Sequence, residues 1–288
     1  MTNRRLFLRT SLLGLAAAAH DIASGQNGLP PPPRIDSRAC IVVDAVNGQV
    51  LFEKAADERR PVASTQKLLS ALVAVESVDM KKIITVEEAD TNCEPSKLYI
   101  KPGEKLPLIT ILNAMLIKSY NDAAQCMARN VGGSIPGFAA MMNRRAAKLG
   151  MSNSHFVNPH GLPADGQYST ARDMSRLARA AFFNPTIRSI VGRHEVTIKR
   201  GDGRPHTMSN TNYLLKPDSS YFLPQCTGMK TGFTNAAGKC LVSSATLRGR
   251  TVICVLLGAW KKDSKDVSSM AWRESKALLQ WALGITAP

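Results

Sequence analysis

Ser64 and Lys67 lie three residues apart in the segment VASTQKLLSALVAVESV, residues 62–78. The segment is mostly apolar and predicts a buried helix, on which residues three apart share a face. Apolar surroundings and the positive end of a helix dipole make a lysine amine lose its proton more readily. A neutral amine can accept the proton of a neighbouring serine hydroxyl. We therefore predict Ser64 as a nucleophile and Lys67 as its general base.

The same two residues have an ordinary alternative interpretation. Ser64 can cap the helix, and Lys67 can extend its amine to solvent. A Ser-x-x-Lys pattern also arises by chance about once in a chain of this length. The pair therefore needs support from other parts of the sequence.

Two further motifs follow in order along the chain. Ser119-Tyr120-Asn121 interrupts a helical stretch, and Lys230-Thr231-Gly232 stands at the expected start of a strand, in GMKTGFT. Taken singly, each is an ordinary turn or a strand-edge lysine. Together with Ser64 and Lys67 they reproduce a motif set known from penicillin-binding proteins and class A β-lactamases.

On these motifs the chain resembles the secreted serine D-alanyl-D-alanine carboxypeptidases, the low-molecular-mass penicillin-binding proteins of bacteria. The resemblance runs over about residues 38–283. Further stretches that match the family pattern are residues 101–104, 119–124, 158–162, 169–173 and 210–212.

The resemblance implies a role for each motif residue. Ser64 would attack the carbonyl between two D-alanines and form an acyl-enzyme, with Lys67 as base. Ser119 would relay a proton to the leaving amine. The groups that would bind substrate come from the second and third motifs: Asn121 for the peptide amide, Lys230 for positive charge, Thr231 for the terminal carboxylate, and Gly232 and Phe233 beside the oxyanion hole.

The resemblance also implies which substrates and inhibitors bind, and that no metal or cofactor takes part. Peptidoglycan stem peptides would be substrates, β-lactam antibiotics would be acylating inhibitors, and no metal or cofactor would be needed. The family often carries an arginine for the substrate carboxylate after the last long strand. Here that region reads AWKKDSKDV, so the expected substitutes are Lys261, Lys262 or Lys265. His160 is expected to be a structural loop residue.

Three alternatives to a carboxypeptidase remain. A β-lactamase shares the motifs, but class A enzymes need a glutamate between the second and third motifs. The only glutamate between Asn121 and Lys230 is Glu195, in a strand-like setting. A D-alanyl endopeptidase of the same family cannot be separated by sequence. A non-catalytic cell-wall-binding protein is disfavoured by the intact motifs.

The remaining sequence predicts the elements that position these residues. Two β-rich runs flank Asn47-Gly48 and predict a hairpin over residues 39–54. Helices are expected from Ser64 and over 107–131 with a break at 119–121. Further helices are expected over 138–149 with Gly150 as the stop, over 169–183 with Pro185 as the end, and over 270–283, with two paired strands turning near 248–249. This order predicts an α+β fold with an antiparallel sheet from both chain ends, flanked by helices, plus a helical subdomain.

The chain start has a different composition. Residues 1–24 hold Arg4-Arg5, a short apolar run and small residues, the layout of an export signal, with a twin-arginine variant favoured. A Pro-rich linker is expected over 25–37, the peptidase domain over 38–288, and no second C-terminal domain. The protein is thus predicted to be exported, periplasmic or extracellular, without an integral membrane domain.

The net charge of the chain indicates which kinds of binding partner to expect. The chain carries a formal net charge of +15, of which residues 1–24 contribute +2, leaving +13 for the rest. Such an excess suits an anionic partner, and an acidic wall polymer fits an exported protein better than nucleic acid. Dense basic tracts with aromatic residues are absent, so nucleic-acid binding is not expected.

The six cysteines form no C-x-x-C pair, which argues against a zinc or redox motif and leaves open one or two disulfides.

Overall fold

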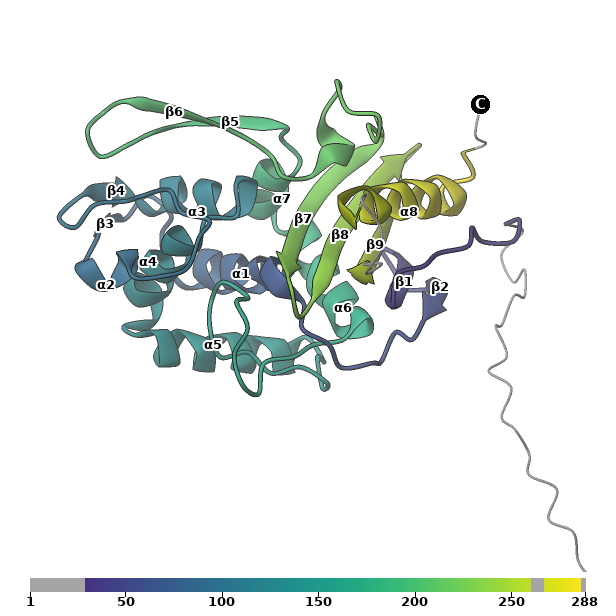
Figure 1. The fold of residues 1–288 in the computed structure, drawn as a ribbon, viewed down its shortest axis with the longest axis horizontal. Coiled ribbons are helices and arrows are strands. Elements are labelled where there is room, and N and C mark those ends of the chain that lie inside the picture. Colours follow the sequence, from purple (N-terminus) through teal and green to yellow (C-terminus); the bar gives the residue numbers. More distant parts are fainter. Residues whose placement is uncertain (1–28, 260–266, 286–288) are drawn as a thin grey trace, which may run out of the picture.

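A five-stranded antiparallel sheet forms the frame of the protein in the computed structural model, which describes residues 29–259 and 267–285. Its strand order is β2-β1-β9-β8-β7, so the first and last strands of the chain are neighbours at its centre (Figure 1). The strands are β1 (Ala39–Asp44), β2 (Val50–Lys54), β7 (Cys226–Thr234), β8 (Gly238–Leu247) and β9 (Arg250–Ala259). The predicted α+β class and the sheet from both chain ends are confirmed.

The sheet is apolar on both faces because each face is covered by helix. On one face Cys40, Val42 and Leu256 pack with Trp272 and Leu279 of helix α8 (Val267–Ala282). Alternate residues of the same strands point to the opposite face and join the larger core. This arrangement explains why β1 and β9 are mostly continuous hydrophobic runs rather than alternating ones.

The second core lies in the helical part of the molecule. Helix α1 (Lys67–Ser77) runs through its centre and is buried from Lys67 to Ala74. Around it lie α3 (Leu108–Ile117), α4 (Asn121–Gly132), α5 (Ile135–Lys148) and α6 (Ala171–Phe183). Short elements at the edge are β3 (Ile83–Thr85), α2 (Glu88–Thr91) and β4 (Lys105–Pro107). A helix apolar around its circumference is stable only when enclosed in this way.

The polar stretch between residues 184 and 225 contains more structure than the sequence analysis assigned. Pro185 does not only end α6; it begins α7 (Pro185–Val191), because proline suits the first helical position and the Asn184 side chain caps Ile187 N at 3.1 Å. A projecting hairpin of β5 (Glu195–Lys199) and β6 (Pro205–Ser209) follows, and then the 3-10 helix η2 (Tyr213–Leu215).

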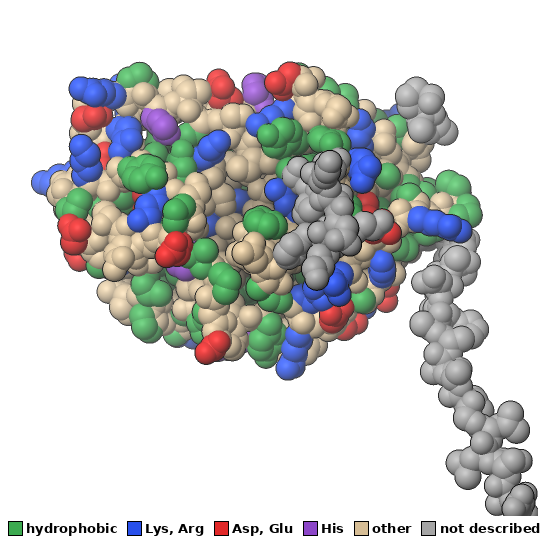
Figure 2. Space-filling view, viewed as in Figure 1, with side chains coloured by type: hydrophobic (Ala, Val, Ile, Leu, Met, Phe, Trp, Pro, Cys, Tyr) green, Lys and Arg blue, Asp and Glu red, His purple; other side chains and the backbone are tan. Residues whose placement is uncertain are grey.

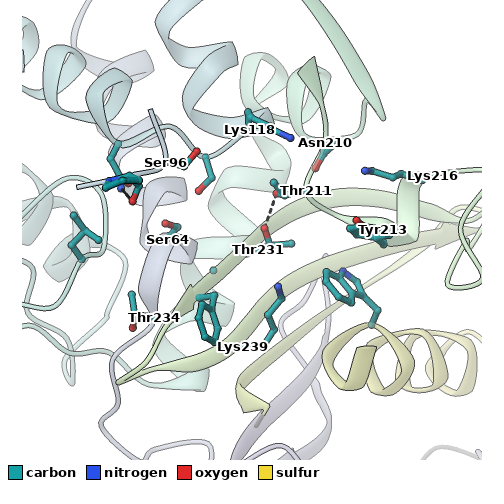
Figure 3. Close-up of a pocket in the computed structure, with 17 residues that line it drawn as sticks. Ser64, Ser96, Lys118, Asn210, Thr211, Tyr213, Lys216, Thr231, Thr234 and Lys239 are labelled. Carbon is teal, nitrogen blue, oxygen red and sulfur yellow. Dashed lines mark hydrogen bonds between the residues drawn. The ribbon is translucent and has the colours of Figure 1, made fainter. Parts of the chain in front are cut away.

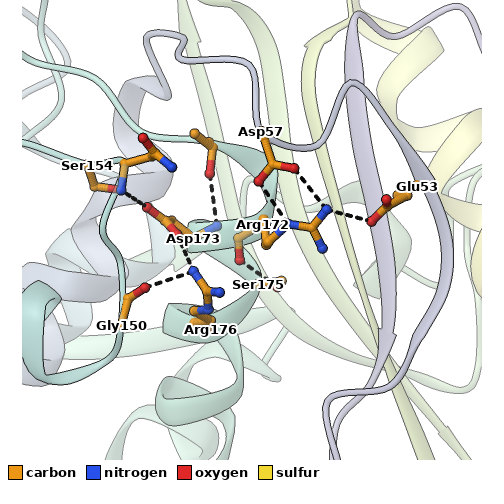
Figure 4. Close-up of polar contacts among 10 residues, drawn as sticks. Glu53, Asp57, Gly150, Ser154, Arg172, Asp173, Ser175 and Arg176 are labelled. Carbon is orange, nitrogen blue, oxygen red and sulfur yellow. Dashed lines mark hydrogen bonds and ion pairs between the residues drawn. The ribbon is translucent and has the colours of Figure 1, made fainter. Parts of the chain in front are cut away.

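A polar network ties the long loop before α6 to the rest of the molecule (Figure 4). The buried Asp173 carboxylate accepts hydrogen bonds from Asn153 N and Ser154 Oγ, both at 2.8 Å. The neighbouring Arg172 guanidinium pairs with Asp57 and with Glu53 of β2, also at 2.8 Å. Residues 150–170 are therefore held between α6 and the first hairpin, which fixes the loop segment that reaches the candidate site.

The remaining expectations concern the chain ends and the cysteines. The predicted export signal lies outside the described residues, whereas part of the predicted linker contacts α8, where Trp281 Nε1 donates to Pro30 O at 2.6 Å. All six cysteines are free thiols in this structure. Within the described ranges, no helix combines the length and apolar character needed to cross a membrane.

Candidate active site

Ser64 lies in the 3-10 helix η1 (Ala63–Gln66) that leads into α1, and it does not cap the helix. Two glycines allow other segments to approach its backbone. A Cβ on Gly232 of β7 would lie 2.8 Å from Ser64 N, and a Cβ on Gly161 would lie 2.1 Å from Ala63 O. Neither distance is tolerated by a real side chain, so glycine at both positions lets β7 and the 158–162 loop press against η1 from two sides.

Lys67 is fully buried, and its amine is surrounded by three oxygen atoms. Lys67 Nζ lies 2.9 Å from Ser64 Oγ, 2.7 Å from Asn121 Oδ1 and 3.0 Å from the backbone carbonyl of His160. The predicted alternative in which Lys67 extends to solvent is wrong, because helices enclose the whole side chain.

The three contacts of this amine are compatible with its neutral form. Asn121 Nδ2 donates to the carbonyls of Glu94 and Pro95 at 3.0 and 2.9 Å, so its Oδ1 must face Lys67. A neutral amine has two hydrogens and one lone pair. In that form, Asn121 Oδ1 and the His160 carbonyl can accept both hydrogens, and the lone pair can then accept the hydroxyl hydrogen of Ser64.

The electrostatic surroundings favour that neutral form. Burial lowers the pKa of Lys67 well below its usual value, and the charge of Lys230 lowers it further. Lys230 of β7 is 1% exposed, and its Nζ donates to the Thr231 carbonyl at 3.0 Å. Burial, and next the charge of Lys239, lowers the pKa of Lys230 to about 7. Lys230 lies in the middle of β7 rather than at the strand start that the sequence predicted.

His160 contributes its backbone rather than its ring. Burial, followed by the charge of Lys67, lowers the pKa of its imidazole to about 3, so the ring is neutral at physiological pH. Leu162 N donates to His160 Nδ1 at 3.2 Å, which fixes the ring in the loop. The carbonyl of the same residue contacts both Lys67 Nζ and Ser64 Oγ, the latter at 3.2 Å.

A cavity of about 370 Å³ opens over Ser64, between β7 and the helical part (Figure 3). Ser119 enters it immediately after α3, with a backbone φ of 68°. Thr231 Oγ1 donates to Thr211 Oγ1 at 2.6 Å on the opposite wall. Of the predicted residues, six line the cavity: Ser64, Ser119, Asn121, Thr231, Gly232 and Phe233. Lys67 and Lys230 lie buried behind this wall.

Sequence reasoning missed several lining residues and named others that are elsewhere. Unforeseen members of the wall are Pro95, Ser96, Lys118, Leu162, Asn210, Thr211, Tyr213, Lys216, Thr234, Lys239 and Trp272. Among them, Leu162, Asn210 and Thr211 had a usable signal, because they lie in the stretches 158–162 and 210–212 that match the family pattern. Lys261, Lys262 and Lys265 lie outside the described residues. Glu195 is an exposed residue of β5 and does not line the cavity.

The comparisons agree with this geometry. The family model described as D-alanyl-D-alanine carboxypeptidase, Peptidase S11, matches residues 26–261. The chain is 31% identical to the D-alanyl-D-alanine carboxypeptidase DacF of Bacillus subtilis, over 78% of this chain and 58% of that protein. It is 33% identical to DacA of Escherichia coli strain K12, over 96% of this chain and 69% of that protein. The chain thus spans 58% of the length of the first relative and 69% of the length of the second.

A solved structure gives the same result at the level of the fold. The D-alanyl-D-alanine carboxypeptidase of Mycobacterium tuberculosis H37Rv superposes with a TM-score of 0.81 at 31% identity, covering 90% of this chain and 95% of that one. Family model, relatives and fold point the same way as the Ser64–Lys67 pair and the two other motifs. The chain belongs to the D-alanyl-D-alanine carboxypeptidase family of serine peptidases, Peptidase S11.

Proposed function

We propose that this protein removes the terminal D-alanine of peptidoglycan stem peptides through an acyl-enzyme on Ser64. One observation carries the proposal: the buried amine of Lys67 lies 2.9 Å from Ser64 Oγ, and two further oxygens, Asn121 Oδ1 and the His160 carbonyl, can accept the two hydrogens of its neutral form. An amine with only its lone pair directed at a hydroxyl acts as a general base.

In the acylation step, the Ser64 proton passes to Lys67 as Oγ attacks the carbonyl carbon of the penultimate D-alanine. The backbone N–H groups of Ser64 and Phe233 stabilise the resulting oxyanion. Collapse of this intermediate breaks the C–N bond, and the proton held by Lys67 reaches the leaving amine through Ser119. Water then attacks the acyl-enzyme, with the same base receiving its proton, and releases the shortened peptide and free Ser64.

Asn121 has a different part from the one that the resemblance suggested. Its side chain is occupied by Lys67 on one side and by two backbone carbonyls on the other. In this proposal it orients the Lys67 amine, and contact with the substrate amide would require the 94–95 carbonyls to release its Nδ2. Thr231 and Lys230 serve the carboxylate end of the substrate.

The proposal includes the place of action and the inhibitors. Residues 1–24 would direct export to the periplasm or the exterior, where residues 38–288 act on the wall. β-Lactams would acylate Ser64 in the same way as the peptide. Lys and Arg side chains are spread over the face seen in Figure 2 rather than gathered in one tract, which suits broad attraction to an anionic wall polymer.

The test is to incubate the protein with a fluorescent penicillin and locate the adduct by mass spectrometry. We expect a stable adduct on Ser64, D-alanine release from a pentapeptide by the wild type, and loss of both in Ser64→Ala. Ser152→Ala, an exposed serine on another loop, is the matched control. D-alanine release that persists in Ser64→Ala would overturn the mechanism. Rapid penicillin turnover without an adduct would indicate a β-lactamase, and cleavage of cross-linked muropeptides would indicate an endopeptidase.

A further inference from the structure

The cavity continues past Thr231 onto the face of the sheet that α8 covers. Lys239 of β8 pairs directly opposite Phe233 of β7. Directly opposed residues of an antiparallel pair point to the same face, and so do residues two apart on one strand. Lys239, Phe233 and Thr231 are therefore on one face, and all three line the cavity. Figure 3 shows the Lys239 side chain pointing toward the part of the cavity that Thr231 borders.

The surroundings of the Lys239 amine are aromatic rather than acidic. Its Nζ lies 4.5 Å from the ring centroid of Trp272 and 5.9 Å from that of Phe233. Among the residues described, no carboxylate or carbonyl oxygen accepts a hydrogen bond from this amine. The ring faces attract the ammonium group, but they leave its N–H donors without acceptors.

The rest of this wall also offers donors without acidic partners. Trp272 is 5% exposed, and in the described structure its indole Nε1 has no acceptor. The charged residues that line the cavity are Lys118, Lys216 and Lys239, and no Asp or Glu stands among the described lining residues. A half-buried cation that faces such a cavity is suited to bind an anion there.

Two pKa shifts support this picture of an unneutralised charge. Burial lowers the pKa of Lys239 itself. The charge of Lys239 is in turn the second cause, after burial, of the lowered pKa of Lys230. A bound carboxylate would relieve both effects at once, because it supplies the opposite charge beside two crowded amines.

We propose that Lys239 binds the terminal carboxylate of the peptide substrate, with the hydroxyl group of Thr211, which accepts a hydrogen bond from Thr231, as a further donor, and so selects peptides with a free C-terminus. This inference rests on the proposed function. It places the carboxylate of the leaving D-alanine on the β8 side of Thr231, while the scissile carbonyl lies over Ser64. Trp272 and Phe233 hold the ammonium group in position from either side.

The experiment compares two substrates that differ only at the C-terminus: an N-acylated D-alanyl-D-alanine peptide and its C-terminal amide. We expect the wild type to prefer the free acid in kcat/KM. Lys239→Met should lower kcat/KM for the acid by about 10- to 100-fold, as expected for loss of a charge-assisted hydrogen bond. Its rate on the amide should fall far less, because the amide lacks the charge that Lys239 would bind, and Lys239→Arg should restore much of the preference. Lys276→Met, which removes a half-buried lysine of α8 whose amine donates to the Ser220 carbonyl at 3.4 Å, is the charge-matched control.

The outcomes separate this inference from the proposed function. Equal losses on acid and amide in Lys239→Met would overturn the inference, as would an acid preference that survives in that variant. An acid preference abolished equally by Lys276→Met would show a diffuse effect of charge and would also overturn it. Failure of the wild type to cleave either substrate would instead overturn the proposed function. The amide rate shows that each variant is folded.

Discussion

At the scale of single residues, Lys67 can act as a general base because it is buried and lies near the positive charge of Lys230. Solvent would keep the same side chain protonated and unable to act as a base. Burial and the charge of Lys230 both oppose protonation of its amine, and Asn121 and His160 orient it. A lysine with a lowered pKa becomes active as pH rises through that pKa and inactive as pH falls below it.

Lys230→Gln tests this arrangement. Removal of the Lys230 charge should raise the pKa of Lys67, so the acid limb of the acylation rate should move to higher pH. The difference should be greatest below pH 7 and shrink above it, since the pKa of Lys230 itself is about 7. The measurement is the rate of fluorescent-penicillin acylation against pH, with Lys276→Gln as control. An acid limb that stays in place, or moves to lower pH, would contradict the electrostatic role.

At the scale of elements, the site depends on three segments meeting around η1. Strand β7 presses on it through Gly232, and the 158–162 loop presses through Gly161. The loop in turn is held by the Asp173 network at the start of α6. Distant segments thus converge on one turn of helix, and side-chain volume at either contact would separate them.

Gly161→Ala should therefore destabilise the protein and impair the site together. The position has φ +88°, and the added methyl would meet Ala63 O at 2.1 Å. We expect a loss of more than about 3 kcal/mol in the free energy of unfolding, since a clash adds to backbone strain of about 1–3 kcal/mol. Gly133→Ala is the control, because its φ is +74° and a methyl added there would have no atom within 4 Å. Equal losses in urea unfolding would show that backbone strain alone acts at Gly161.

At the scale of the whole molecule, the protein is held together by its two cores rather than by covalent links. Sheet and α8 form one core, and sheet and helical part form the other. The cavity lies where β7, the free edge of the sheet next to η1, borders the helical part. No disulfide joins these parts, because all six cysteines are free.

Alkylation tests this absence of cross-links. Protein unfolded without reductant should take up iodoacetamide at all six cysteines, as judged by intact mass. Native protein should react slowly, because four thiols are buried and burial raises the pKa of Cys93 to about 11 and of Cys226 to about 12. Fewer than six modifications after unfolding would reveal a disulfide. A melting temperature lowered by reductant would lead to the same conclusion.

Much of the fold and of the motif set follows from local sequence. The Asn47-Gly48 hairpin, the break between α3 and α4 and the stop at Gly150 are turn and cap signals that act over a few residues. The spacing of Ser64 and Lys67 places them on one face of a helical turn, whatever surrounds it. Helix α7 was missed because the sequence analysis took Pro185 only as the end of the preceding helix.

Tertiary structure alone decided what those residues can do. The lowered pKa of Lys67 comes from burial by segments that are distant in the sequence. One hydrogen-bond partner of its amine is the backbone carbonyl of His160, and a backbone contact cannot be predicted from the residue type. Lys239 reaches the cavity only through the register of β8 on β7 and the docking of Trp272 from α8. Local spacing sets which side chains share a turn, whereas proton affinity and ligand charge depend on long-range packing, because desolvation and Coulomb interactions act through space rather than along the chain.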